Sequence, residues 1–441
     1  MATIRPKERD ALLQSMRAGV VPRVGQRLVQ VGRAKEVAAL LQEIERVADG
    51  GSAFRLVIGE YGSGKTFFLN LIRSIALEKK LVTANADLNP DRRLHSTGGQ
   101  ARSLYAELMK NLSTRTKPDG GALPAVVERF VSEAAQEARR SGAKTENVIH
   151  QRLENLKEMV NGYDFADVVE AYWRGHETDN EQLKSDAVRW LRAEFSTKSD
   201  ARKSLGVRTI IDDANGYDML KLTARFVRLA GFSGLMVCFD ELVNLYKLAH
   251  TQSRNGNYEQ ILRILNDSLQ GNSVGLGILL GGTPEFLMDT RRGLYSYAAL
   301  ASRLTENRFA KDGLVDFSGP VLRLSNLTKE EFYLLLEKLR YVFAYGDPKK
   351  FLVPDEALPA FMGHCSKRIG DAYFRTPRNT ITAFVHLLSV LEQNSSAKWT
   401  DLLDAMELRK DDEGGMTTEA GGASGNDGAV SDDDNLASFK L

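Results

Sequence analysis

The sequence predicts an α/β protein in which helices cover both faces of a parallel β-sheet. Five short segments are rich in Val, Leu, Ile and Phe with little polar alternation, which is typical of strands buried on both faces. Helical segments separate these five segments, and that alternation favours parallel strands. A glycine-rich stretch, GEYGSGKTFFLN at 59–70, follows the first apolar segment and leads into a helical pattern.

The expected elements follow in order along the chain. An N-terminal arm with one helix is expected over 1–50, and a core that contains the sheet over 51–325. The strands of this core are expected at 53–59, 80–87, 234–240, 274–282 and 321–326. About 146 residues separate the second strand from the third, too many for one crossover helix, so a helical insertion is expected at about 115–215. Helical patterns at 328–345, 378–393 and 400–408 predict a helical lid over 326–410.

Composition limits the class of protein. The chain has 441 residues, which suggests more than one lobe, and 43% of them are apolar, enough for a sizeable core. No apolar run approaches the ~20 residues of a membrane span, and the N-terminus MATIRPKERD lacks an apolar signal core. Cys238 and Cys365 lie far apart and form no metal-binding spacing. These features favour a cytoplasmic protein without membrane contact.

Charge is distributed unevenly along the chain. Residues 411–441 contain eight acidic residues and one basic residue, so their net charge is −7. The first 410 residues contain 58 basic and 50 acidic residues, so their net charge is +8. A mildly basic body is compatible with nucleic-acid contact without requiring it. The acidic tail is expected to be disordered. Its end, DDDNLASFKL, is either a solvated terminus or a docking peptide whose apolar residues insert into a partner.

The stretch at 59–70 has the composition of a phosphate-binding loop. It fits G-x-x-x-x-G-K-[ST] from Gly59 to Thr66, with a strand before it and a helix after it. Glycines let backbone N–H groups line an anionic concavity, and Lys65 would reach the β- and γ-phosphates while Thr66 coordinates Mg²⁺. The alternative is a chance glycine turn. The expected nucleotide-binding residues of this loop are Gly59, Glu60, Tyr61, Gly62, Ser63, Gly64, Lys65, Thr66 and Phe67.

A carboxylate pair follows the third expected strand. Asp240 and Glu241 end the apolar run GLMVCFDE. Asp240 would hold Mg²⁺ and its water shell, and Glu241 would act as the base that polarises the attacking water. The alternative is that these acids begin a surface turn or helix. An acidic pair directly after an apolar strand is costly unless a cation lies nearby, which favours the metal-site interpretation.

Thr283 follows the fourth expected strand, at the edge where ligands gather in open α/β sheets. Its hydroxyl is a candidate to position the attacking water between Glu241 and the γ-phosphate. The alternative is a helix cap, because Thr followed by Pro is a capping signature. Asn266, on the preceding helix, is a second candidate for the same role.

Arginines in two later segments are candidates for contact with the γ-phosphate. Arg303 and Arg308 lie in ALASRLTENRF, from which an arginine of one subunit would reach the nucleotide of its neighbour. Arg378 opens a lid helix in RTPRNTITAFVHLL, and Arg375 in the same segment is the second candidate there. A cation at a helix N-terminus opposes the helix dipole and therefore favours a nearby anion. The alternative for each is an ordinary exposed helix arginine.

The segment before the first strand is a candidate for binding the adenine. RAGVVPRVGQRLVQVGRAKEV is apolar and kinked, which suits a flat base. Simple packing of the N-terminal arm is an equally consistent interpretation. The candidate residues are Val21, Pro22, Val31, Gly32 and Arg33.

Several motifs together carry a resemblance to a known family. VGRAKEV, GEYGSGKT, FDE, GGTPEF, ASRL and TPRN resemble, in this order, the motifs of AAA+ P-loop ATPases of the ASCE class, especially the branch of origin-recognition and helicase-loading proteins. ALLQSMRAGVVPRVGQRLVQVGRAKEV and GFSGLMVCFDELVNL resemble the BREX-type ATP-binding proteins of phage-defence clusters, the BrxD-like family. The resemblance implies a three-layer α/β/α core with sheet order 5-1-4-3-2, a helical lid, ATP binding and oligomerisation. Thr283 departs from the Asn common in the family.

Three functions are consistent with these residues. The first is an ATP hydrolase of a BREX-like defence system, which uses Mg²⁺ and remodels or loads a partner such as a helicase on DNA, as a homo-oligomer or in a complex with other defence proteins. The second is a nucleotide-gated switch or scaffold with little turnover, which the departure at Thr283 and the insertion favour. The third is a DNA-binding regulator with structural ATP, but no strong helix-turn-helix signal supports it.

Overall fold

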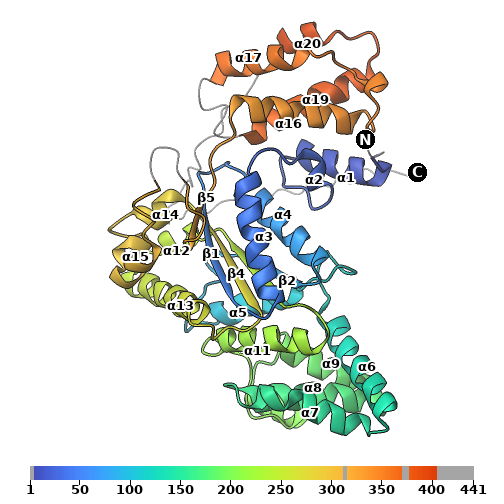
Figure 1. Ribbon diagram of the computed structural model, residues 1–441, viewed down its shortest axis with the longest axis vertical. Helices are drawn as coiled ribbons and strands as arrows, with labels where there is room; N and C mark the ends of the chain where they lie inside the picture. The colour runs from blue at the N-terminus through green and yellow to red at the C-terminus, as the bar shows by residue number, and fades with distance from the viewer. Residues whose placement is uncertain (1–3, 311–314, 370–376, 405–441) are drawn as a thin grey trace, which may run out of the picture.

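The computed structural model describes residues 4–310, 315–369 and 377–404, and within them five strands form one parallel sheet (Figure 1). The strands are β1 (Ala53–Ile58), β2 (Val82–Asp87), β3 (Leu235–Asp240), β4 (Leu276–Gly282) and β5 (Val321–Arg323). All five lie within the ranges that the sequence predicts, and each is one to three residues shorter than its predicted range. Their order is β2-β3-β4-β1-β5. Read from the β5 edge, this list is 5-1-4-3-2, with the same neighbours as the expected order.

Helices cover both faces of the sheet. α3 (Ala34–Ala48) and α4 (Lys65–Glu78) pack on one face, where Ala53 and Val57 of β1 point. α5 (Gln100–Lys110), α11 (Gly216–Leu229) and α13 (Thr251–Leu269) pack on the other face with alternate residues of the same strands. Because both sets of strand residues are buried, the strands show no polar alternation in the sequence.

The long interval between β2 and β3 is helical. After α5 come α6 (Leu123–Ser141), α7 (Thr145–Lys157), α8 (Gly162–Glu177), α9 (Glu181–Leu191) and α10 (Lys198–Leu205). These helices lie at the end of the molecule opposite the C-terminal helices (Figure 1). Phe226 of α11 joins them to the sheet, because its ring lies 5.2 Å from that of Phe130 and 5.6 Å from that of Phe165. The inserted helices therefore share one hydrophobic core with the sheet.

The C-terminal helices form a separate hydrophobic cluster that includes the first helix of the chain. The helices are α16 (Lys329–Phe343), α17 (Ala357–Ile369), α19 (Pro377–Gln393) and α20 (Trp399–Asp404). α1 (Pro6–Arg17) lies beside α16 and α19 (Figure 1) and buries Leu12, Leu13 and Met16 among them. Arg9 donates to the Phe343 carbonyl at 3.0 Å and to Glu392 at 2.8 Å. Within the predicted N-terminal arm, α1 thus packs with the lid while α3 packs on the sheet.

Short helices complete the described chain. They are α2 (Gln26–Val29), α12 (Val243–Tyr246), α14 (Pro284–Met288) and α15 (Ala298–Leu304), with single 3₁₀ turns at Leu294–Ser296 and Pro348–Lys350. Within the described ranges, no helix combines the length and apolar character needed to cross a membrane. Arg375 and the predicted tail at 411–441 lie outside the described residues, and the helix predicted at 400–408 is described only to Asp404.

Candidate functional site

The loop between β1 and α4 has the conformation that its glycines allow. α4 begins at Lys65, directly after Gly64. Gly62 (φ 78°) and Gly64 (φ 82°) lie in the left-handed region, which residues with a Cβ rarely adopt. At Gly59 a Cβ would lie 2.5 Å from the Ser63 hydroxyl oxygen, so a larger residue here would require the Ser63 side chain to shift. The loop has the strand–turn–helix context of a phosphate-binding loop.

Lys65 folds back over this loop. Its Nζ donates to the carbonyl oxygens of Gly59 at 2.8 Å and Glu60 at 2.9 Å. Burial lowers the pKa of Lys65, and the nearby carboxylates of Asp240 and Glu241 oppose that effect. A charge-assisted bond to a phosphate is stronger than a bond to a neutral carbonyl, so a bound anion would draw the Lys65 ammonium toward itself.

Thr66 and Asp240 meet beside the loop. The Thr66 hydroxyl donates to Oδ2 of Asp240 at 2.6 Å, and Asp240 is only 8% exposed. Oδ1 of Asp240 accepts the backbone N–H of Glu241 at 2.8 Å. Among the described residues, no group of three or more His, Cys, Asp or Glu forms a metal site by itself. The hydroxyl and carboxylate oxygens fit Mg²⁺, which binds through one or two protein ligands and completes its shell with phosphate and water oxygens.

Glu241 turns the chain sharply after β3. It has φ 58°, a left-handed conformation that is uncommon outside glycine, and its partly exposed carboxylate lines the pocket beside the loop. Partial desolvation and the charge of Asp240 raise the pKa of Glu241, while Lys65 lowers it. A carboxylate with a raised pKa is suited to accepting a proton from water.

Asp87 is a third carboxylate that the sequence interpretation missed. It is the last residue of β2 and pairs with Asp240 in the parallel register. Desolvation and the charge of Asp240 raise the pKa of Asp87. The signal was present in the sequence, because Asp87 ends an expected buried strand in the same way as Asp240 does.

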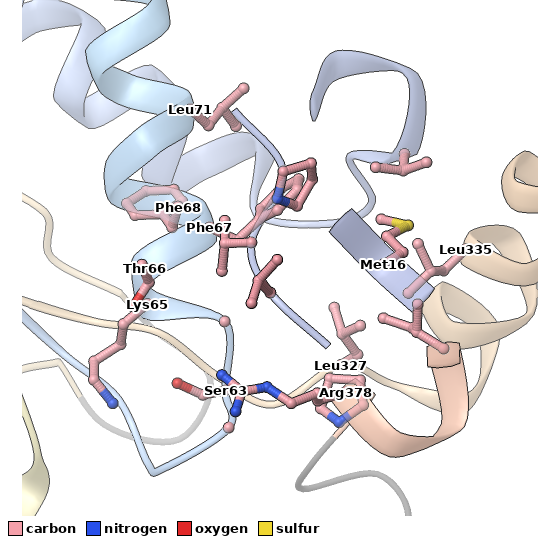
Figure 2. Close-up of a pocket in the computed structure, with 18 of the residues that line it drawn as sticks. Met16, Ser63, Lys65, Thr66, Phe67, Phe68, Leu71, Leu327, Leu335 and Arg378 are labelled. Atoms are coloured by element: carbon pink, nitrogen blue, oxygen red, sulfur yellow. The ribbon is translucent and has the colours of Figure 1, made fainter. Parts of the chain in front are cut away.

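A pocket beside the loop collects residues from segments that lie far apart in the sequence (Figure 2). Among them, Thr66 and Phe67 belong to α4, Met16 to α1, and Leu335 to α16. The predicted adenine residues that line it are Val21, Pro22, Val31 and Arg33, whereas Gly32 is not among the lining residues. The sequence interpretation missed the other apolar wall residues, which are Met16, Val20, Val29, Phe68, Leu71, Leu327, Leu335, Pro377 and Ile381. No local signal marks them, because they come from segments that meet only in the folded chain.

Arg33, which was predicted to bind the adenine, contacts the backbone of the glycine-rich loop. It precedes α3 in a left-handed conformation, and its guanidinium donates to the carbonyl oxygens of Ser63 and Gly64. Burial lowers the pKa of Arg33, and the charges of Glu36 and Glu331 oppose that effect. The guanidinium therefore holds the outside of the phosphate loop.

Of the remaining candidates, some line the pocket and others do not. Thr283 is the N-cap of α14, and its hydroxyl accepts the N–H of Phe286 at 3.4 Å. Arg378, in the first turn of the lid helix α19, lines the pocket (Figure 2). Four candidates are not among the lining residues: Thr283, Asn266 on α13, exposed Arg308, and Arg303 on α15, which is exposed and donates to the carbonyl of Ala299 in its own helix.

The chain also matches a known protein family over most of its length. The model of the family described as BREX system ATP-binding protein BrxC/D matches residues 4–407. The chain belongs to this family. The BrxC/D match runs through the inserted helices and the lid as well as the sheet, so it confirms the resemblance carried by the sequence motifs. Membership supports ATP binding as the role of this chain in a BREX phage-defence system. No curated protein matches the chain.

Proposed function

We propose that the protein is an AAA+-type P-loop ATPase that hydrolyses ATP with Mg²⁺ to remodel or load a defence partner, such as a helicase on DNA. The observation that carries the proposal is the 2.6 Å hydrogen bond between Thr66 and Asp240, which joins the phosphate loop to the carboxyl end of β3. The position of β4 between β1 and β3 agrees with the sheet order that the AAA+ resemblance implied.

Each residue beside the loop has a distinct role in this proposal. The N–H groups of the loop and the Lys65 ammonium bind the phosphates. Thr66 and Asp240 would hold Mg²⁺, which when bound would supply positive charge to neutralise the phosphates. Glu241 accepts a proton from the attacking water, and Thr283 orients that water.

Two arginines supply positive charge at the γ-phosphate. Arg378 lines the pocket from the lid, so it acts within its own chain. Arg303 is exposed and does not line the pocket of its own chain, so it is available to the nucleotide of a neighbouring subunit. This role for Arg303 requires an oligomer, or a complex with other defence proteins. The net charge of +8 on the first 410 residues is compatible with direct DNA contact.

A nucleotide-gated switch with little turnover is the second candidate function. The hydroxyl of Thr283 already accepts the backbone N–H of Phe286 at 3.4 Å, so it is engaged as a helix cap. A hydroxyl held in this way orients water less effectively, and slow hydrolysis would leave ATP bound. The protein would then assemble partners for as long as the nucleotide remains.

Steady-state ATP hydrolysis distinguishes these two functions. The wild type is measured over a series of protein concentrations, with and without duplex and single-stranded DNA, beside Glu241→Gln. Lys79→Ala is the matched control, because Lys79 lies at the exposed end of α4 and pairs with Glu45 at 3.1 Å. ATP turnover that rises with protein concentration and on addition of DNA, and that is lost in Glu241→Gln, supports the ATPase function. Tight ATP binding with little turnover supports the switch, and no ATP binding would overturn both.

Mixing two inactive variants tests the role of Arg303. Lys65→Ala lacks a working nucleotide site but keeps Arg303, whereas Arg303→Ala keeps the site. If Arg303 acts across subunits, turnover recovers on mixing, because each variant supplies the group that the other lacks. No recovery, at concentrations where wild-type turnover has reached its plateau, would contradict the assignment.

A further inference from the structure

Arg33 connects separate parts of the nucleotide site. Its guanidinium donates to the Ser63 carbonyl and, at 3.4 Å, to the Gly64 carbonyl of the phosphate loop. The same group reaches the carbonyl of Ser325 at 3.4 Å. Ser325 lies in the short connection between β5 and α16, where the chain leaves the sheet and enters the lid. One side chain therefore contacts both the loop and the entrance to the lid.

These contacts fix the direction of the loop's peptide groups. In a trans peptide, the carbonyl oxygen and the N–H of the following residue point to opposite sides. Because Arg33 contacts the carbonyls of Ser63 and Gly64, and the Gly64 carbonyl also accepts the Phe68 N–H at 3.0 Å, the N–H groups of Gly64 and Lys65 point away from Arg33. Successive N–H groups that point in one direction form an anion-binding concavity. Arg33 thus arranges the loop for a phosphate before one arrives.

The backbone beside Arg33 contacts the first lid helix. Gly32 (φ 62°) and Arg33 (φ 59°) are both left-handed. A Cβ at Gly32 would overlap Oε1 of Glu331, so the backbone at Gly32 packs directly against that carboxylate. Glu331 closes the capping box of α16 with Thr328. The same short turn holds the loop through the Arg33 side chain and the lid through the Gly32 backbone.

We propose that Arg33 is a positioning residue that couples occupancy of the phosphate loop to the position of the lid. A bound triphosphate draws Lys65 away from the carbonyls of Gly59 and Glu60 and orders the loop N–H groups around itself. Arg33 transmits the accompanying shift of the Ser63 and Gly64 carbonyls to Ser325. This inference rests on the ATP binding proposed above, and it adds a route from the nucleotide to the lid that does not involve Arg378.

Hydrogen exchange of the full chain, with and without saturating ATP and Mg²⁺, tests the coupling. In the wild type, ATP is expected to slow exchange at 59–66 and at 324–331. In Arg33→Gln, ATP affinity falls about tenfold, as for the loss of a charged hydrogen-bond partner, and saturating ATP slows exchange at 59–66 alone. Arg27→Gln is the matched control, because Arg27 lies on the same segment, pairs with exposed Glu78, and does not line the pocket.

The outcomes separate this inference from the proposed function. No ATP-dependent change at 59–66 in the wild type would defeat the proposed function itself. The coupling alone would be wrong if ATP slowed exchange in the wild type at 59–66 but not at 324–331. It would also be wrong if ATP slowed exchange at 324–331 in Arg33→Gln as much as in the wild type. Arg33→Lys keeps the charge but not the fork that spans two carbonyls, so it is expected to bind ATP and lose the response at 324–331. If neither variant binds ATP, Arg33 serves binding only and the coupling is wrong.

Discussion

The Thr66 hydroxyl donates to Oδ2 of Asp240 at 2.6 Å, across a separation of 174 residues in the sequence. Thr66 lies in the first turn of α4, which follows β1, and Asp240 ends β3. β4 lies between these two strands in the sheet. The two residues meet because parallel strands present their carboxyl ends at one edge, where the loops that follow converge.

Thr66→Ala is expected to lower Mg²⁺-dependent ATP turnover about 100-fold, because it removes the hydroxyl that we propose as a ligand of the cation. Thr66→Ser is the matched control, since it keeps the hydroxyl and should stay within a few-fold of the wild type. The measurement is kcat as a function of Mg²⁺ concentration. Equal Mg²⁺ dependence in the two variants would show that the hydroxyl does not bind the cation.

Lys65→Ala is expected to weaken ATP binding about 100-fold, because Lys65 supplies a charge-assisted contact that the loop N–H groups cannot replace. Isothermal titration with ATP measures the change. Lys79→Ala, at the far end of the same helix, should bind as the wild type does. Unchanged affinity in Lys65→Ala would place the phosphates elsewhere.

Glu241→Gln is expected to keep ATP binding and to lower turnover about 100-fold, because the amide cannot accept the proton of the attacking water. Single-turnover hydrolysis of bound ATP isolates this step from nucleotide exchange. Normal single-turnover kinetics in Glu241→Gln would remove Glu241 from the role of base and leave Asp87 as the other carboxylate to test.

The raised pKa of Glu241 predicts a pH dependence with a definite sign. Desolvation, Asp240 and Asp87 raise this pKa, while Lys65 and Lys247 lower it. A base works when deprotonated, so turnover should fall as pH drops through a midpoint above 4.5, the ordinary value for Glu. The residual turnover of Glu241→Gln should not show this fall at low pH. The measurement is kcat as a function of pH between 5 and 9. If kcat of the wild type and of Glu241→Gln fell at low pH with the same midpoint, the titration would belong to another group.

Leu12→Ala is expected to destabilise the lid by about 2–5 kcal/mol, because Leu12 is fully buried between α1 and the lid helices. Hydrogen exchange of the α16 and α19 amides measures the loss. Gln14→Ala, on the exposed side of α1, should change stability by less than about 0.5 kcal/mol. Equal protection of the lid amides in both variants would mean that α1 does not support the lid.

Local patterns were sufficient to locate the strands of the sheet and to predict the residues at the centre of the candidate site. The five strands could be located because burial on both faces leaves unbroken apolar runs, as in LMVCFD of β3. Gly59, Lys65 and Thr66 were identifiable because a phosphate loop needs fixed residue types at fixed spacing. Asp240 and Glu241 were identifiable because acids directly after a buried strand lie at the ligand-binding edge of a parallel sheet.

The sequence by itself therefore determined the parallel α/β core, the phosphate loop and the carboxylates that follow β3, since each depends on residues close together in the chain. Only the tertiary structure decided that α1 packs in the lid, that Leu327 and Leu335 line the pocket beside the loop, and that Arg33 holds the loop carbonyls. Those contacts join segments up to several hundred residues apart. Packing of whole helices brings them together, and no local spacing encodes that packing.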